Sequence, residues 1–521
     1  MKVCLISPSR DSKTYDTKTI KRYKYYTELN GLQHLGLGYL TSVLEQDGHE
    51  VYYLEMSLLS ISINNVVEMV INNNVQAIGI TTFFSTMKTL VKLVNILKSK
   101  CPDLFIFVGG YLATLSSDLL LKRPIDCCVI GEGETTIREL INAIQTNKEW
   151  HNIDGLAYKE NSQIIFTHKR RLIDDLDTLP FPKRIFPEGF FNIACVVSSR
   201  GCYGKCTFCN ISEFYSRCNG YSVRRRKPEK VVEEIKLLIE KYNVKIIRFN
   251  DDNFPISTNI DRIWFDNFYR LIKENDINVS FYCSFRANEV VASPDLVRKF
   301  VNIGLDDIDV GVESFVKEQL KFYNKGTTVE QNIEALKIIC ALGINFSFGH
   351  PIFDPRVSIE EIREYISHVK EMDFLLTAQC IIKPLSVNCC IVASEGTPMR
   401  TYVEKNSLYE ENERCYNFIH SEVQLCYESI NKWVEIINPI VDLRYLFFIA
   451  EEFDNTDIIK RIKEAFRSLF LLDLNVFEDI ILWVKKGFNL ENIVLKIHDC
   501  YDSQIDIIFK NMVNIKNILL P

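Results

Sequence analysis

Short apolar runs alternate with amphipathic stretches through residues 1–145, and this alternation is the feature that most restricts the fold. An amphipathic helix is predicted over Leu35–Glu50, a second follows the third predicted strand and runs to Ser99, and a third begins with Glu134–Ile144. Such an order predicts right-handed βαβ units in a doubly wound, Rossmann-like parallel sheet, whose ligands bind beyond the carboxyl ends of the strands. The predicted strands are Val3–Ser7, Val51–Glu55, Val75–Thr81, Leu104–Gly110 and Asp126–Gly131.

Two glycine-containing turns, Gly109–Thr114 and Gly131–Thr135, follow the fourth and fifth predicted strands. Glycine lets the backbone approach a ligand closely, and the helix that follows offers unpaired N–H groups. Tight turns between a strand and a helix also use glycine without any ligand, so "GEGE" by itself is weak evidence for a site. No GxGxxG sequence follows the first strand, which disfavours a nicotinamide cofactor.

The alternation stops and then resumes, which divides this α/β chain into an N-terminal domain, residues 1–145, and three further parts. Residues 146–191 are predicted to contain a hairpin over Gly155–Thr167 and a linker rich in proline and acidic residues. Residues 192–400 suit a partial (β/α)6 barrel with its chemistry at the strand carboxyl ends. Residues 401–521 are predicted to form a small helical domain. The six predicted barrel strands are Ile193–Ser198, Lys245–Phe249, Asn278–Cys283, Asp307–Val310, Asn345–Phe348 and Thr377–Ile382.

Composition narrows the class of protein. The 521 residues carry a net charge of −7, so no overall basic surface points to nucleic acid, and only Arg224–Lys227 forms a local basic run. Neither a secretory signal nor a membrane-spanning helix is apparent, which predicts a cytoplasmic protein. Seventeen cysteines in a reducing compartment argue against a disulfide framework.

Three cysteines, Cys202, Cys206 and Cys209, follow the first barrel strand with the spacing C-x3-C-x2-C. Thiolates are soft ligands that suit iron–sulfur clusters or zinc. A structural zinc site takes four ligands, which Cys218 would complete, whereas a four-iron cluster held by three thiolates keeps one iron free. A buried apolar corner is disfavoured because glycine, lysine and asparagine lie among the thiols.

With this cysteine spacing inside a partial barrel, Asn192–Met399 resembles the radical S-adenosylmethionine (SAM) superfamily. Later strand ends add to the resemblance through "RFNDDNF" (Arg248–Phe254), "SFRANEV" (Ser284–Val290) and "DVGVES" (Asp309–Ser314). The resemblance implies that the three cysteines hold a [4Fe–4S] cluster as the metal site. Its free iron would bind SAM, and electron transfer would cleave SAM to a 5′-deoxyadenosyl radical.

The resemblance also implies contacts to SAM, which carries a carboxylate, an ammonium and a ribose diol. Arginine binds a carboxylate through two parallel hydrogen bonds, so Arg286 is assigned to that group. Acids accept from the ammonium or the ribose hydroxyls, which assigns Glu313 with Ser314, and Asp252 as a weaker candidate. Phe208 resembles the aromatic residue that this family packs near adenine. A salt bridge, a helix cap or an apolar contact explains any one of these residues taken alone.

The doubly wound domain before such a barrel resembles the cobalamin (B12)-binding group of radical SAM enzymes. "HLGLGYLTSVLEQDGHEVYYLE", "VGGYLAT", "IGEGETTIREL" and "LDTLPFP" carry this likeness. No D-x-H-x-x-G sequence is present, so the resemblance implies cobalamin held without a histidine ligand. The expected contacts lie at the ends of the third, fourth and fifth strands, and core packing explains Phe83 equally well. They are Thr81, Thr82, Phe83, Gly109, Gly110, Tyr111, Thr114, Gly131, Glu132 and Gly133.

The first functional hypothesis is a cobalamin-dependent radical SAM methyltransferase that acts on an unactivated carbon, or phosphorus, of a natural-product, peptide or lipid precursor. A cobalamin-independent peptide epimerase is the alternative, with Cys380, Cys389 or Cys390 returning hydrogen from a thiol. Two further hypotheses are a ring-forming or rearranging member of the cobalamin group and a non-enzymatic scaffold that carries zinc or a cluster. The expected partners are a small-molecule or peptide substrate and an external electron donor of the flavodoxin or ferredoxin type, without nucleic acid.

Overall fold

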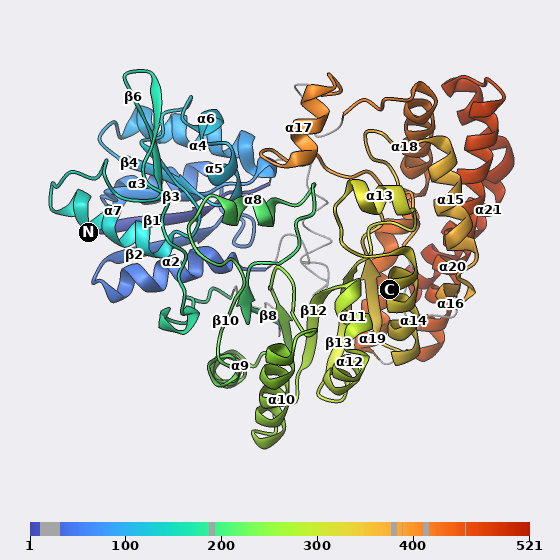
Figure 1. The fold of residues 1–521 in the computed structure, drawn as a ribbon, viewed down its shortest axis with the longest axis horizontal. Helices are drawn as coiled ribbons and strands as arrows, with labels where there is room; N and C mark the ends of the chain where they lie inside the picture. Colours follow the sequence, from blue (N-terminus) through green and yellow to red (C-terminus); the bar gives the residue numbers. More distant parts are fainter. Residues whose placement is uncertain are drawn as a thin grey trace. The chain divides into compact units, whose positions relative to one another are not determined.

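The computed structural model describes residues 1–10, 32–186, 193–376, 383–387, 389–409, 416–453 and 455–520 (Figure 1). The chain divides into two compact units. Unit 1 consists of Met1–Tyr203, Cys209–Phe254 and Arg270–Val279. Unit 2 consists of Gly204–Phe208, Pro255–Tyr269 and Ser280–Pro521.

Unit 1 contains a seven-stranded sheet with the order β2-β1-β3-β4-β5-β6-β7. Strands β1 to β5 pair in parallel, which confirms the predicted doubly wound arrangement. The predicted hairpin is present as β6 and β7, and β6 extends the sheet by pairing antiparallel to β5. The strands are β1 (Lys2–Ser7), β2 (Glu50–Glu55), β3 (Ala77–Thr81), β4 (Phe105–Gly109), β5 (Cys127–Val129), β6 (Leu156–Glu160) and β7 (Gln163–Phe166).

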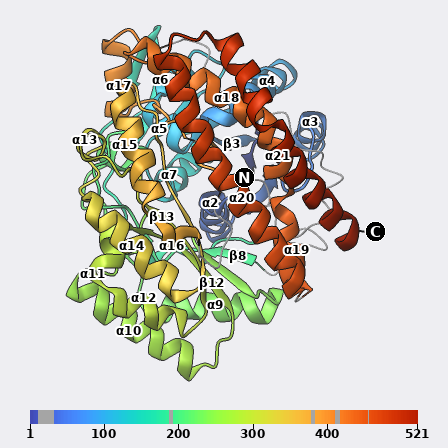
Figure 2. The same cartoon turned by 90° about the vertical axis from the view of Figure 1, so that its right-hand side faces the viewer.

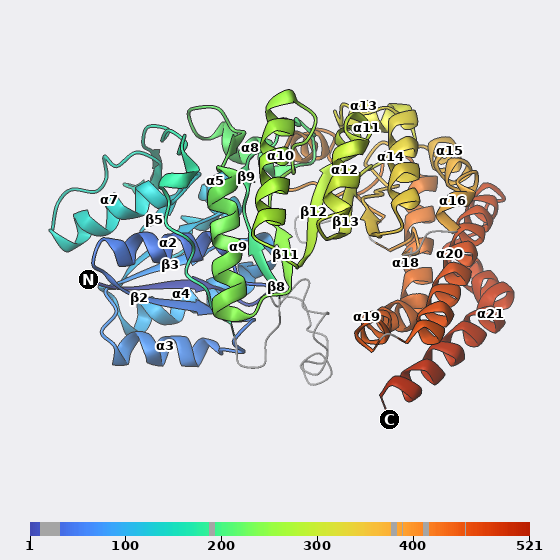
Figure 3. The same cartoon turned by 90° about the horizontal axis from the view of Figure 1, so that it is seen from below.

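Helices cover both faces of this sheet (Figure 3). The apolar sides of α3 (Ile63–Asn72) and α4 (Met87–Lys100) pack on one face, and those of α2 (Leu35–Gln46) and α7 (Glu134–Gln145) pack on the other. Because both faces are covered, every residue of the central strand β3, sequence AIGIT, is buried. The short helices α5 (Tyr111–Leu115), α6 (Ser117–Leu120), η1 (Phe84–Thr86) and η2 (Leu176–Thr178) complete this part.

The remaining part of unit 1 holds the first two barrel strands. β8 (Ile193–Val196) and β11 (Ile246–Phe249) pair in parallel, as the sequence predicts. Between them in the chain, β9 (Ser199–Arg200) and β10 (Arg224–Arg225) form a two-residue antiparallel pair. Helices α8 (Asn210–Ser216) and α9 (Pro228–Tyr242) follow the cysteines and the basic run, and Pro228 occupies the first turn of α9.

Unit 2 holds a parallel arrangement of β12 (Ser280–Arg286), β13 (Leu305–Gly311) and β14 (Asn345–Phe348). Each of these strands was predicted, whereas the sixth predicted strand, Thr377–Ile382, lies outside the described residues. The helices of this part are α10 (Asn259–Glu274), α11 (Ala287–Ala292), α12 (Pro294–Val301), α13 (Lys317–Phe322), α14 (Val329–Leu342), α15 (Ile359–Lys370) and α16 (Asp373–Leu376).

The C-terminal region is helical, as predicted, and Figure 2 shows its two long helices α20 and α21. The sequence shows amphipathic patterns over Asp457–Leu472 and Val476–Phe488, and the single 30-residue helix α20 spans the first and most of the second. Asp473 is buried and accepts a hydrogen bond of 2.7 Å from Nε1 of Trp433 on α18. The elements are α17 (Pro398–Lys405), α18 (Ser421–Val441), η3 (Asp442–Arg444), α19 (Tyr445–Glu452), α20 (Thr456–Lys485) and α21 (Leu490–Leu519). Among the helices of the described ranges, none is long and apolar enough to cross a membrane.

Candidate functional site

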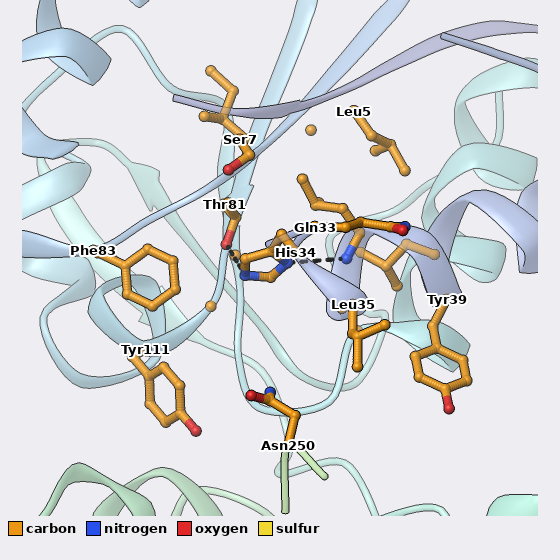
Figure 4. A pocket seen from close by; sticks show the side chains of 18 of the residues that line it. Leu5, Ser7, Gln33, His34, Leu35, Tyr39, Thr81, Phe83, Tyr111 and Asn250 are labelled. Carbon is orange, nitrogen blue, oxygen red and sulfur yellow. Dashed lines mark hydrogen bonds between the residues drawn. The ribbon is translucent and has the colours of Figure 1, made fainter. Parts of the chain in front are cut away.

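A cavity of about 590 Å³ opens in unit 1 at the carboxyl ends of the sheet strands (Figure 4). Ser7 of β1, Thr81 of β3 and Gly109 of β4 are the last residues of their strands and line one part of it. Residues that follow β8 and β11, among them Arg200 and Asp252, line another part. The cavity therefore adjoins both the predicted cofactor turns and the chain segment that leads into the three cysteines.

Eight of the ten residues predicted to contact cobalamin line this cavity; they are Thr81, Phe83, Gly109, Gly110, Tyr111, Gly131, Glu132 and Gly133. The other two hold the turns together. The Thr82 hydroxyl donates to the carbonyl of Gly109 at 2.8 Å, and the Thr114 hydroxyl accepts from the N–H of Gly131 at 3.0 Å. Gly110 has a φ of 92°, and a Cβ there would lie 3.0 Å from Thr81 Oγ1, so glycine keeps this turn open toward the cavity.

Aromatic rings form one side of the cavity. Phe83 and Tyr111 lie with ring centroids 6.3 Å apart, and Tyr111 lies 4.9 Å from Phe214, which comes from α8 beyond the cysteines. The rings of Phe83 and Tyr111 lie at the strand ends (Figure 4), and all three aromatic residues line the cavity. A flat, partly apolar macrocycle with polar amide arms fits a cavity lined by rings and by open backbone turns. The residues present thus fit cobalamin.

His34 also lines the cavity, and the sequence analysis missed it. It caps α2, because its Nδ1 accepts the Leu37 N–H at 3.1 Å. An imidazole that accepts at Nδ1 carries its proton on Nε2, which lies 3.3 Å from the Thr81 hydroxyl. Burial lowers the pKa of His34 and favours this neutral form. Its sequence signals are its place directly before the predicted helix and at the start of the stretch "HLGLGYLTSVLEQDGHEVYYLE".

A buried ion-pair network joins the turn after β5 to the strand that precedes the cysteines. Arg200 contacts Glu132 at 2.9 Å and Glu134 at 2.6 Å, and Arg224 contacts Glu132 at 2.8 Å. All four side chains are at most 15% exposed. Glu132 was predicted to contact cobalamin, and here its carboxylate is engaged by two arginines. Arg224 belongs to the basic run that had no assigned role.

The acidic pair after β11 holds the start of the cluster loop, which we define as Gly201–Cys209. Asp252 accepts the Gly201 N–H at 2.8 Å and the Tyr215 hydroxyl at 3.2 Å. Asp251 accepts the Ser198 N–H at 2.7 Å. Burial raises the pKa of both carboxyl groups. Asp252, a candidate SAM contact, is therefore bonded to the backbone of the loop itself.

The three predicted cluster ligands differ in exposure: Cys206 is buried, and Cys202 and Cys209 are partly exposed. Within the described ranges, no group of three His, Cys, Asp or Glu side chains is placed to hold a single metal ion. A four-iron cluster does not need such convergence, because each thiolate binds a different iron. Cys218 packs against the turn after β5, since a Cβ on Gly131 would lie 2.0 Å from its sulfur.

In unit 2, Arg286 at the end of β12 lies beside a cluster-loop cysteine. Its Nη1 is 3.5 Å from the Cys206 sulfur, and a second nitrogen donates to the carbonyl of Lys325. Glu313, after β13, forms an ion pair of 2.9 Å with the Lys325 ammonium. The structure thus brings Arg286 and Glu313 to Lys325, a residue that the sequence analysis did not single out, and places Cys206 beside Arg286.

The other two candidate SAM contacts in unit 2 interact with neighbouring side chains. The Ser314 hydroxyl donates to Gln319 of α13 at 2.6 Å and accepts the Val316 N–H at 3.0 Å, so both of these hydrogen bonds are made to residues at or near the start of α13. Phe208 packs edge-to-face on Tyr323, with centroids 5.7 Å apart.

The candidate thiol donors have separate surroundings. Burial raises the pKa of Cys389 well above its ordinary value, so this thiol keeps its proton and is a poor nucleophile. A hydrogen-atom donor must also carry its hydrogen, so the raised pKa does not argue against that role. Cys390 lies 3.6 Å from the Tyr416 hydroxyl. Cys380 lies outside the described residues.

Comparison with known proteins agrees with this arrangement. A model described as "Radical SAM superfamily" matches residues 196–369, and one described as "B12 binding domain" matches residues 30–141. An uncharacterized methyltransferase, PH0819 of Pyrococcus horikoshii, is 28% identical over 482 residues, which cover 90% of this chain and 98% of that protein. An anaerobic magnesium-protoporphyrin IX monomethyl ester cyclase of Synechocystis is 29% identical over 318 residues, 59% of this chain and 62% of that protein.

Two solved structures share the fold. The cobalamin-dependent SAM radical enzyme OxsB, with aqua-cobalamin bound, superposes with a TM-score of 0.75 at 17% identity and covers 98% of this chain and 80% of its own. The radical SAM methyltransferase TsrM of Kitasatospora setae gives 0.61 at 15% identity, over 78% of this chain and 75% of its own. The two domains imply a [4Fe–4S] cluster, SAM and cobalamin as cofactors. The chain is therefore a radical SAM enzyme that carries a B12 binding domain ahead of its radical SAM domain.

Proposed function

We propose that this enzyme is a cobalamin-dependent methyltransferase that acts on an unactivated carbon, or phosphorus, of a natural-product, peptide or lipid precursor. The observation that carries the proposal is the cavity of about 590 Å³, because its wall includes both the glycine turns of the B12 binding domain and Arg200, the residue before the cluster loop. The methyltransferase names of PH0819 and TsrM support the same reaction class.

In this proposal the cavity holds cobalamin. Thr81, Phe83 and Tyr111 would contact the macrocycle, and the backbone of Gly109–Gly110 and Gly131–Gly133 would approach its amide arms. Thr82 and Thr114 keep those turns in shape through their hydrogen bonds. The aromatic side of the cavity excludes water, which protects reactive species from side reactions.

The cluster and SAM would lie at the loop Gly201–Cys209 and at the neighbouring strand ends. Cys202, Cys206 and Cys209 would bind three irons, Arg286 the SAM carboxylate, and Glu313 a donor group of SAM. When bound, the cluster and SAM supply a 5′-deoxyadenosyl radical that removes a substrate hydrogen, and cobalamin supplies the methyl group. Arg286 suits its role because it lies 3.5 Å from the Cys206 sulfur, at the cluster end of the site. An external donor of the flavodoxin or ferredoxin type would provide the electrons.

Product analysis tests the proposal. Protein reconstituted anaerobically with iron, sulfide and hydroxocobalamin, then given SAM and a strong reductant, is expected to form both 5′-deoxyadenosine and S-adenosylhomocysteine. The Cys209→Ala variant should form no 5′-deoxyadenosine, because its cluster would lack a ligand. Formation of 5′-deoxyadenosine without S-adenosylhomocysteine, with cobalamin bound, would contradict methyl transfer and favour the ring-forming chemistry named for the Synechocystis relative.

Thiol variants test the epimerase alternative. Cys389→Ala and Cys390→Ala should leave SAM cleavage and product formation unchanged, because methyl transfer needs no thiol to return hydrogen to the substrate. Loss of hydrogen return to the substrate in either variant, with SAM cleavage retained, would instead assign that thiol a catalytic role.

A further inference from the structure

The segment Phe322–Gly326 follows α13 and is bonded to the cluster loop on both sides of Cys206. The carbonyls of Phe322 and Tyr323 accept from the Thr207 hydroxyl at 3.0 Å and the Thr207 N–H at 2.9 Å. On the other side, the Asn324 amide donates to the Lys205 carbonyl at 2.8 Å. The position of this segment therefore determines the position of the loop that carries Cys206.

Lys325, within this segment, binds two of the candidate SAM contacts of unit 2, Arg286 and Glu313. Its carbonyl accepts a hydrogen bond from Arg286. Its ammonium donates to Oε1 of Glu313 at 2.9 Å. Lys325 is only 4% exposed, and lysine is rarely buried unless it is paired. One residue thus fixes Arg286 through its main chain and Glu313 through its side chain.

Two glycines make room for this ion pair. A Cβ on Gly311, at the end of β13, would lie 2.7 Å from the Lys325 ammonium. A Cβ on Gly349, just after β14, would lie 2.6 Å from Oε2 of Glu313. Any other residue at either position would push the pair aside, because contacts that short are not tolerated. Glu313 itself has a φ of 70°, an uncommon conformation for a residue with a side chain.

The two carboxylate oxygens of Glu313 have different environments. Oε1 is held by Lys325, and no described residue is hydrogen-bonded to Oε2. The side chain is 15% exposed, so it is not sealed from a ligand. A carboxylate with one oxygen fixed by a buried cation presents the other in a defined direction, which suits an N–H or O–H donor.

We propose that Lys325 is a positioning residue of the SAM site: its ammonium orients Glu313 so that Oε2 accepts from the SAM amino group, while its carbonyl orients Arg286 toward the SAM carboxylate. This inference rests on the proposed function, since it takes Arg286 and Glu313 as SAM contacts. Lys325 does not touch SAM in this account and acts through its two partners.

Equilibrium binding of SAM to the anaerobically reconstituted protein tests the proposal. Lys325→Met removes the ammonium and keeps the carbonyl, so SAM affinity should fall by about 10- to 100-fold, the effect of losing one charge-assisted hydrogen bond. Iron content should stay at the wild-type level. Lys321→Met, which changes an exposed lysine on α13, is the matched control and should bind SAM normally.

A double-mutant cycle separates positioning from general destabilisation. If Lys325 acts through Glu313, the Lys325→Met/Glu313→Gln protein should bind SAM about as weakly as Glu313→Gln alone. Gly349→Ala is a second, independent variant that displaces Oε2 and leaves both charges in place, and it should weaken SAM binding with normal iron content. Wild-type affinity in both Lys325→Met and Gly349→Ala, or fully additive losses in the cycle, would overturn the proposal.

Two further binding measurements show whether a negative result contradicts the role of Lys325 or the proposed function. 5′-Methylthioadenosine has the ribose of SAM and lacks its amino-acid arm, so its affinity should be equal in wild type and Lys325→Met. A parallel loss with this ligand would contradict the amino-group assignment and place Glu313 at the ribose. A wild-type protein that holds iron and does not bind SAM would contradict the proposed function itself, and this inference would fall with it.

Discussion

Arg200 and Glu132 form an ion pair of 2.9 Å in which neither side chain is more than 15% exposed. Arg200 directly precedes the cluster loop, and Glu132 lies in the turn after β5 that lines the cavity. The pair therefore makes a direct connection between the predicted cobalamin turn and the predicted cluster loop. Removing one partner of a buried pair leaves the other charge uncompensated.

Glu132→Gln should therefore destabilise unit 1 strongly. Breaking a buried pair costs on the order of 3 kcal/mol, because the buried Arg200 and Arg224 lose a shared anion. Burial alone would raise the pKa of Glu132, and the two arginines hold it below its ordinary value instead. Urea unfolding, monitored by circular dichroism, measures the loss in the free energy of unfolding. Glu233→Gln, which breaks an exposed pair with Lys230, should cost less than about 1 kcal/mol, and equal losses in the two variants would refute this account.

Asp473 should make the helical C-terminal region less stable as the pH rises from about 4 to about 6. Burial raises its pKa from 3.8 to about 6, so the folded protein keeps a proton that the unfolded chain has released. The protonated Asp473 contributes its full stabilisation below the pKa of the unfolded chain. This stabilisation, roughly 3 kcal/mol, is lost as the pH rises through the pKa of the folded protein. The free energy of unfolding of wild type and Asp473→Asn, measured across this range, should differ in slope. Parallel curves would show that Asp473 does not titrate there.

His34 should not bind cobalt, although it lines the cavity. Its Nδ1 accepts from Leu37 and its Nε2 proton points at Thr81, so neither nitrogen offers a lone pair to a metal. The EPR spectrum of the reduced, cobalamin-loaded protein should show no nitrogen splitting that depends on His34, so it should be the same in His34→Asn. Nitrogen splitting that disappears in this variant would show a histidine ligand.

Cys218 should be dispensable for the metal site. Its sulfur packs against Gly131, and burial raises its pKa, which disfavours the thiolate that a metal requires. Iron analysis and the visible spectrum of reconstituted Cys218→Ser should match wild type, whereas Cys209→Ser should lose most of its iron. A stable four-cysteine zinc centre that depends on Cys218 would instead support the hypothesis of a non-enzymatic zinc scaffold.

Much of this arrangement follows from local sequence pattern. The parallel strands were predictable because apolar runs of strand length alternate with amphipathic helices, and the cavity turns were predictable because they follow β4 and β5. The spacing C-x3-C-x2-C predicts three cluster ligands from sequence alone, because these residues lie close together in the chain. The merger of two amphipathic stretches into α20 was not predicted, since nothing local marks Asp473 as a buried helix interior residue.

Contacts between residues that lie far apart in the sequence could not be predicted. Neither the Arg200–Glu132 pair nor the Lys325–Glu313 pair follows from periodicity, because local pattern does not specify which charges meet after folding. The hydrogen bond of the Ser314 hydroxyl to Gln319 was not foreseen either, and the assignment of Ser314 to SAM stays a prediction. His34 was passed over because a helix cap and a cavity residue have the same sequence signal.

Optical titration of the cobalamin-free, anaerobically purified protein with hydroxocobalamin tests the central claim most directly. The account predicts saturable binding of about one cobalamin per chain, with a spectral change on binding. Gly110→Val should abolish it, because valine cannot adopt the φ of 92° at this turn without strain and its side chain would enter the space beside Thr81. Absence of binding by the wild-type protein would contradict cobalamin-dependent methyl transfer.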